Sequence, residues 1–161
     1  MPDPFYFRIP NTPSRLLFLD IDGVLNTLSD DEAGLLTRRC VDELKRVLLE
    51  LPDLRIVISS TWREKFGLFR LGFVWRQYDL SEHWVIDRTP VKLFDSRGIE
   101  ILSWIEETAP LLGIKPDVHF AVLEDEPDWI FPDIPKENAF ICNPEKGLTK
   151  RIANRLIRFL K

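Results

Sequence analysis

Two aspartates, Asp20 and Asp22, follow the apolar run Leu16–Leu19 with a single residue between them. In an extended chain, residues i and i+2 point to the same side, about 6–7 Å apart, so the two carboxylates can share one wall of a crevice. Such a pair can bind a hard cation, or one acid can act as nucleophile while the other transfers protons. Gly23 then permits a sharp exit from the strand, because glycine adopts φ values that other residues resist. A solvated turn is the alternative, and the spacing does not match an EF-hand calcium loop.

Three hydroxyl side chains, Ser59, Ser60 and Thr61, follow a second expected buried strand, Leu54–Ile58. Hydroxyls just beyond a buried strand can donate hydrogen bonds to an anion, helped by the free N–H groups of a following helix. The simpler interpretation is that Ser60 or Thr61 caps that helix. Both interpretations place the three side chains at a strand end.

Two adjacent acids, Glu124 and Asp125, follow a third apolar run over residues 119–123. Mg²⁺ often takes one or two carboxylates and keeps several waters, so the pair predicts metal ligands, with a solvated loop as the alternative. Arg97 lies near the expected start of a helix, after Lys92. A cation at either position can complete a phosphate site, and a solvated basic residue fits the same local pattern.

The elements that must position these residues are short apolar runs alternating with amphipathic segments, which is typical of a parallel α/β sheet. Strands are expected at 16–19, 54–58, 84–86, 119–123 and 139–142, helices around 41–51, 99–105 and 152–160, and a helical or irregular aromatic segment at 62–78. Asp95 or Ser96 can cap the second of these helices, and Thr149 the last. Ligands of open parallel sheets bind at the carboxyl ends of the strands, so we expect the polar clusters to converge on one site.

The bulk composition fits one globular domain spanning residues 1–161, with 45% hydrophobic and 30% charged residues. A net charge of −4 provides no overall positive field for nucleic acid, although a local basic patch stays open. Cys40 and Cys142 form no CxxC pair, and His83 and His119 are isolated, so neither a disulfide framework nor a zinc site is expected. With no signal-peptide pattern and no apolar run near about 20 residues, we expect a soluble, cytoplasmic protein without a membrane partner.

The order of these clusters resembles that of the haloacid dehalogenase (HAD) superfamily: Asp-x-Asp-Gly, a strand-end serine, a basic residue on a helix, and a strand-end acidic pair. A closer resemblance, to the HAD domain of Swiss Army knife RNA-repair proteins, rests on Leu17–Asn26, Ser59–Arg63, Thr89–Pro90, Arg97–Ile101 with Trp104, and Gly147–Thr149. The fourth motif of that domain is usually Asp-Asp, where this chain has Glu124-Asp125. The resemblance implies a three-layer, Rossmann-like parallel sheet of about five strands with helices on both faces.

The resemblance also implies Mg²⁺ as cofactor, held by the Asp20 carboxylate, the Asp22 backbone carbonyl and Asp125, with Glu124 in support. Asp20 would become transiently phosphorylated.

Asp22 would protonate the leaving oxygen and then activate water. Ser59 would bind a phosphoryl oxygen, and Arg97, with Lys92 as the alternative, would offset negative charge.

The substrate is less constrained than the chemistry. The intervals from Asp20 to Ser59 and from Ser59 to Arg97 are each taken up largely by a helix and a strand, so no cap domain is expected and a large substrate can enter. Substrate contacts are expected from Ser60, Thr61, Trp62 and Arg63, the last two as a base stack and a phosphate contact. The alternative for Trp62 is that its ring packs at the start of the following helix. The other tryptophans, Trp75, Trp84, Trp104 and Trp129, are expected to pack in the core or at its edge.

The resulting hypothesis is a phosphatase for a phosphorylated substrate, most specifically a 3′-phosphorylated RNA or nucleotide end. An open site also suits phosphoproteins. The alternatives are a phosphotransferase or mutase on a small metabolite, and a catalytically degenerate binding module. The sequence does not indicate the oligomeric state.

Overall fold

The computed structural model describes residues 12–27, 36–62 and 67–161. Five parallel strands form one sheet in the order β3-β2-β1-β4-β5. Their bounds are Arg15–Leu19 for β1, Leu54–Ile58 for β2, Val85–Arg88 for β3, His119–Glu124 for β4 and Ala139–Ile141 for β5. The expected five-stranded parallel α/β sheet is confirmed. Arg63, the expected phosphate contact, lies outside the described residues.

The central strand β1 is apolar on both sides because both faces of the sheet are covered. Leu17 and Leu19 belong to one hydrophobic cluster, and Leu16 and Phe18 belong to the other. This alternation follows from the two-residue period of a strand. The continuous apolar run seen in the sequence is therefore the signature of a buried middle layer.

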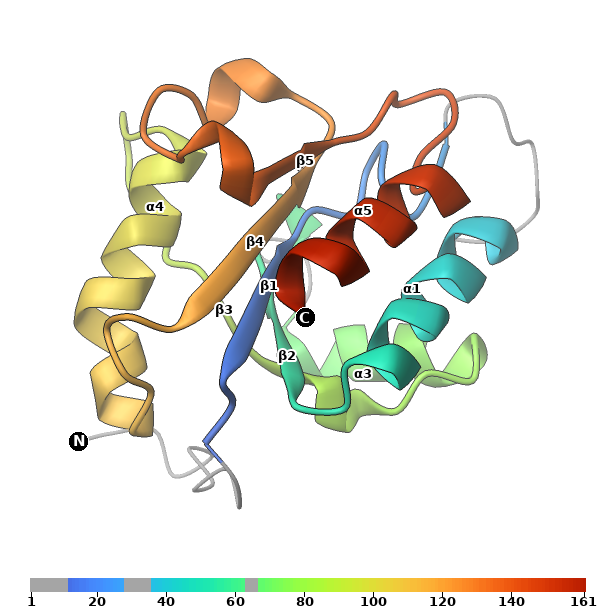
Figure 1. The fold of residues 1–161 in the computed structure, drawn as a ribbon, viewed down its shortest axis with the longest axis horizontal. Helices are drawn as coiled ribbons and strands as arrows, with labels where there is room; N and C mark the ends of the chain where they lie inside the picture. The colour runs from blue at the N-terminus through green and yellow to red at the C-terminus, as the bar shows by residue number, and fades with distance from the viewer. Residues whose placement is uncertain (1–11, 28–35, 63–66) are drawn as a thin grey trace.

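Helices cover the two faces unequally (Figure 1). The bounds are Arg38–Glu50 for α1, Leu68–Gln77 for α3, Arg97–Ser103 for α4 and Lys150–Leu160 for α5. Helices α1, α3 and α5 contribute to the cluster that contains Leu17. Helix α4 and the π-helical turn after it, Trp104–Thr108, pack against the opposite face. The result is the expected three-layer arrangement.

Two of the expected helix caps are present. The Ser96 hydroxyl accepts a hydrogen bond from the Ile99 N–H at the start of α4. The Thr149 hydroxyl accepts one from the Ile152 N–H at the start of α5. Each cap satisfies one of the N–H groups that a helix start leaves without an intrahelical partner.

The strand order reverses between β1 and β4: the chain adds β2 and β3 on one side of β1, and β4 and β5 on the other. In open parallel sheets this reversal opens a crevice at the carboxyl ends of the strands. The acids and hydroxyls singled out in the sequence lie at the carboxyl ends of β1, β2 and β4, at that edge. Within the described parts of the chain, no helix is both long and apolar enough to cross a bilayer.

Candidate active site

The backbone hydrogen bonds of the sheet continue for one residue beyond the ends of β1 and β2. The Asp20 N–H donates to the Leu123 carbonyl at 3.0 Å, and the Ser59 N–H donates to the Leu19 carbonyl at 2.9 Å. Asp20 therefore lies between the residues that follow β2 and those that end β4. Its side chain is buried at 3% exposure.

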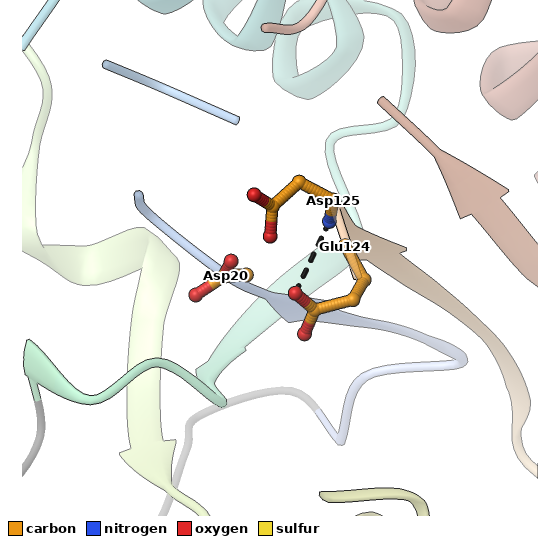
Figure 2. A group of neighbouring side chains, drawn as sticks. All are labelled: Asp20, Glu124 and Asp125. Carbon is orange, nitrogen blue, oxygen red and sulfur yellow. Dashed lines mark hydrogen bonds between the residues drawn. The ribbon is translucent and has the colours of Figure 1, made fainter. Parts of the chain in front are cut away.

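Three carboxyl groups meet at this point. Asp20, Glu124 and Asp125 each offer one oxygen, and these oxygens all lie within 4.8 Å of one another. Figure 2 shows the Asp125 carboxyl turned toward Asp20, while a Glu124 oxygen accepts a hydrogen bond from the backbone N–H of Asp125. An all-oxygen set of this kind suits a hard divalent cation.

Glu124 differs from the other two acids because both of its carboxylate oxygens have protein partners. One oxygen accepts hydrogen bonds from the N–H groups of Asp125 and Glu126 at 3.1 and 3.4 Å. The other accepts from Arg97 Nη1 at 2.9 Å. The fully buried Glu124 thus orients Arg97 and the backbone of Asp125, and leaves Asp20 and Asp125 as the acids better able to bind a metal.

The crowded carboxyl groups have altered proton affinities. Burial first, and then the charge of Glu124, raise the pKa of Asp20 to about 9, against the opposing effect of Arg97. Burial and the neighbouring Glu124 raise the pKa of Asp125 to about 6. Among the described residues, Arg97 is the one cation paired with this group, and one positive charge does not balance three carboxylates. The donor set therefore fits a bound divalent cation that would let Asp20 ionise.

Arg97 is the basic residue that lies beside Asp20. Its Nη1 is 3.4 Å from Asp20 Oδ1, and its side chain is buried. Arg97 is the first residue of α4. The next residue, Gly98, packs so closely that a Cβ there would come within 2.7 Å of the Ile130 carbonyl oxygen. The N-terminus of α4 is therefore pressed against the segment that follows β4.

Lys92, the alternative to Arg97, points elsewhere. Its ammonium lies 3.6 Å from Glu107 in the π-helical turn. Its backbone N–H donates to Glu100 at 3.0 Å. Among the described residues the geometry therefore favours Arg97 as the cation of the site.

Asp22 is exposed, and one of its oxygens has two donors. Asn26 Nδ2 donates to Asp22 Oδ1 at 2.7 Å, and Trp62 Nε1 donates to the same oxygen at 3.0 Å. Asn26 also accepts a hydrogen bond from the Gly23 N–H at 3.0 Å, which closes the turn after β1. Trp62 itself is 7% exposed, so little of its ring is available for the base stack expected from the sequence.

Gly23 is required here for two reasons. Its φ is +76°, a left-handed conformation that side chains disfavour. A Cβ at this position would also overlap the Asp125 carboxyl group. The glycine lets the loop after β1 pass directly over the acid at the end of β4.

The hydroxyl residues after β2 separate into different environments. Ser59 is fully buried, and its hydroxyl has no hydrogen-bond partner among the described residues. An unpaired buried hydroxyl costs free energy, and a phosphoryl oxygen would remove that cost. Ser60 is also buried, and its hydroxyl accepts a hydrogen bond from the Trp62 N–H at 3.3 Å, the contact expected of a capping residue. Thr61 is half-buried.

Sequence reasoning assigned no role to Asn26 and placed Trp129 in the core or at its edge. In the structure, the side-chain amide of Asn26 donates a hydrogen bond to Asp22. Trp129 is half-exposed, and the centroid of its ring lies 4.6 Å from the guanidinium carbon of Arg97. Asn26 lies four residues after Asp22 in the turn, a spacing that could have indicated the contact. No local signal distinguished Trp129 from the other tryptophans.

A comparison with protein families gives one result. The model for the "HAD domain in Swiss Army Knife RNA repair proteins" matches residues 16–153, which is most of the chain. Comparisons with curated proteins and with solved structures found no match. The matched range contains every described residue of the site.

Proposed function

The chain belongs to the family of HAD domains in Swiss Army Knife RNA repair proteins, and from that premise we propose that it is a magnesium-dependent phosphatase. The observation that carries the proposal is the meeting of Asp20, Glu124 and Asp125 at the carboxyl edge of the sheet, with Arg97 beside them. The exposed Asp22 lies two residues from Asp20 and supplies a second acid.

The Asp20 and Asp125 carboxylates and the Asp22 backbone carbonyl would hold Mg²⁺. When bound, the ion would neutralise phosphate charge and let an anionic carboxylate approach an anionic substrate. Glu124 keeps its bonds to Arg97 and to the backbone N–H groups, so it supports the site without binding the ion.

The reaction proceeds in two displacements on phosphorus. An Asp20 oxygen forms a bond to phosphorus as the bond to the leaving oxygen breaks, and Asp22 gives its proton to that oxygen. Water then attacks the phosphorus of the aspartyl-phosphate, the bond between phosphorus and the Asp20 oxygen breaks, and Asp22 takes a proton from the water. Inorganic phosphate leaves, and both aspartates return to their starting state.

The contacts of Asp22 suit this proton-transfer role. Asn26 and Trp62 both donate to Oδ1, so that oxygen stays an acceptor and the proton is carried by Oδ2. Two donors also restrict rotation of the carboxyl group. This division of the two oxygens leaves Oδ2 to give and take the proton.

The remaining charge is handled by two residues. Arg97 offsets negative charge on Asp20 and on the transferred phosphoryl group. Ser59, whose buried hydroxyl lacks a partner within the described part of the chain, donates to a phosphoryl oxygen.

For the substrate we propose a phosphorylated RNA end or nucleotide, with a 3′-phosphate on RNA as the specific candidate. The family description, which places such domains in RNA repair proteins, supports this class. The short intervals between the site motifs support an uncapped entrance that a polymer end can reach.

The test is a comparison of phosphatase activity across sugar phosphates, nucleotides, phosphopeptides and 3′- or 5′-phosphorylated oligonucleotides, with Mg²⁺ and with chelator. We expect hydrolysis that chelation abolishes and Mg²⁺ restores, with the highest kcat/KM on a 3′-phosphorylated RNA. Full activity in excess chelator would remove the magnesium assignment. Preference for a small sugar phosphate would leave the phosphatase and remove the RNA end.

A further inference from the structure

The indole of Trp129 lies beside the site and is partly uncovered. It ends the short helical turn Pro127–Trp129, which follows the acidic pair, and 47% of its surface is exposed. The guanidinium carbon of Arg97 is 4.6 Å from the centroid of its ring. Because Nη1 of the same arginine is 3.4 Å from Asp20 Oδ1, one side chain links the ring to the nucleophile.

An arginine over a tryptophan is not in itself a sign of a binding site. A second pair of this kind exists at the opposite end of the strands. There the guanidinium carbon of Arg55, in β2, lies 5.3 Å from the ring centroid of Trp84, the residue just before β3. That pair is at the amino ends of the strands, away from Asp20. Trp129 differs in its location, since it is at the edge where the carboxylates meet.

Further exposed apolar side chains precede Arg97 in the loop after β3. Leu93 is 83% exposed, and Phe94 is fully exposed with a φ of +70°. A bulky residue in a left-handed conformation is uncommon and often accompanies a binding role. The loop ends at Ser96, whose hydroxyl donates to Asp133 at 2.6 Å and so ties it to the segment after Trp129.

We propose that Trp129 forms a subsite for the nucleobase of the terminal nucleotide whose phosphate lies at Asp20. This inference rests on the proposed phosphatase function and specifies how the substrate is recognised. A base stacked on the indole would keep its sugar and phosphate close to Arg97, the residue that contacts both the ring and Asp20. Stacking is available to every base, so the subsite selects for a base without reading its identity.

The experiment compares two 3′-phosphorylated oligonucleotides that differ only at the last position, one with an ordinary nucleotide and one abasic. In the wild type, kcat/KM for the ordinary end should exceed that for the abasic end by about tenfold or more. Trp129→Leu should erase most of this ratio, and Trp129→Phe, which retains an aromatic face, should keep much of it. Trp84→Leu, which removes the matching tryptophan at the other edge, should leave the ratio unchanged.

Three outcomes would overturn the inference, each in a different way. A ratio near one in the wild type means that no base subsite exists, although the phosphatase stands, and this result needs no variant to fold. Equal losses on both oligonucleotides in Trp129→Leu mean that the indole only holds Arg97. Hydrolysis of other phosphomonoesters but of neither oligonucleotide removes the RNA end from the proposed function, and the base subsite with it.

Discussion

Trp62 and Trp129 each contact a residue to which the proposed reaction assigns a role, and they do so in opposite manners. Trp62 is 7% exposed and donates its indole N–H to Asp22 at 3.0 Å. Trp129 is 47% exposed and offers the face of its ring to Arg97. The first is a buried hydrogen-bond donor, and the second is an exposed aromatic surface.

The difference separates two parts of the site. The proton-transfer side consists of Asp22, Asn26 and Trp62, and it controls where a proton is held. The charge side consists of Arg97, Glu124 and Trp129. It offsets negative charge on Asp20 and on the phosphoryl group, and by our inference it binds the terminal base. Variants of the proton-transfer side should therefore change the dependence of the rate on the leaving group. Variants of the charge side should change the dependence of the rate on the phosphate and on the terminal base.

The largest expected effect is on the proton-transfer side. Asp22→Asn should slow hydrolysis of an alkyl phosphate by about 10²–10⁴-fold, because the poor leaving oxygen needs a proton. Formation of the phosphoenzyme from an aryl phosphate with an acidic phenol should be slowed much less. Single-turnover rates for the two substrates measure this, and equal losses would show that Asp22 is not the acid.

On the charge side, Arg97→Ala should cost about 10²–10³-fold in kcat/KM, as expected for the loss of one preorganised charged donor. The loss should be similar for alkyl and aryl phosphates, because no proton is transferred. Lys92→Ala is the matched comparison, since the Lys92 ammonium faces Glu107. A greater loss from Lys92→Ala than from Arg97→Ala would contradict this assignment.

A smaller effect is expected from Trp62→Phe, which keeps the buried ring and removes the N–H. We expect about a tenfold fall in kcat on an alkyl phosphate, the scale of one hydrogen bond to a charged group, with KM little changed. The same variant should barely alter the preference for an ordinary over an abasic RNA end. If that preference fell instead, Trp62 would be the stacking residue.

A further effect is on stability instead of rate, and it comes from the raised pKa of Asp20. Between the unfolded pKa of about 3.9 and the folded value of about 9, the metal-free folded state holds a proton that the unfolded state has lost. The Asp20 contribution to the free energy of unfolding should therefore fall as pH rises through this window.

Urea unfolding of the metal-free protein at about pH 6 and about pH 8.5, compared with Asp20→Asn, isolates this contribution. Wild type should lose more stability than the variant as pH rises, and Mg²⁺ should restore it by binding the folded state. A wild-type loss no greater than that of the variant would show that Asp20 is not held protonated.

The sequence predicted the sheet well because its signals are local. The residues directly before Asp20, Ser59 and Glu124 (16–19, 56–58 and 120–123) are continuously apolar, as expected of strands covered on both faces. Parallel topology then brings their carboxyl ends to one edge without further information. The convergence of Asp20 with Glu124 and Asp125 follows from this, although their roles stay proposals.

Side-chain contacts between distant segments could not be predicted in the same way. Lys92 lies in the loop between β3 and α4, and Arg97 is the first residue of α4. The packing of α4 against the segment after β4 brings Arg97, and not Lys92, to Asp20. For Trp62 the sequence left both base stacking and packing open. The fold buries its ring and brings its indole N–H to Asp22. For Trp129 the sequence predicted packing in the core or at its edge, and its half-exposed ring beside Arg97 depends on the tertiary fold.

The central claim is that Asp20 carries the phosphoryl group during turnover. The most direct measurement is acid quenching of Asp22→Asn in the presence of Mg²⁺ and an aryl phosphate, followed by mass spectrometry of the peptides. Slowed attack by water on the aspartyl-phosphate should let it accumulate, so the account predicts a phosphoryl group on Asp20 that is absent with chelator and in Asp20→Asn. Turnover by wild type with a phosphoryl group on another residue, or wild-type rates in Asp20→Asn, would contradict it.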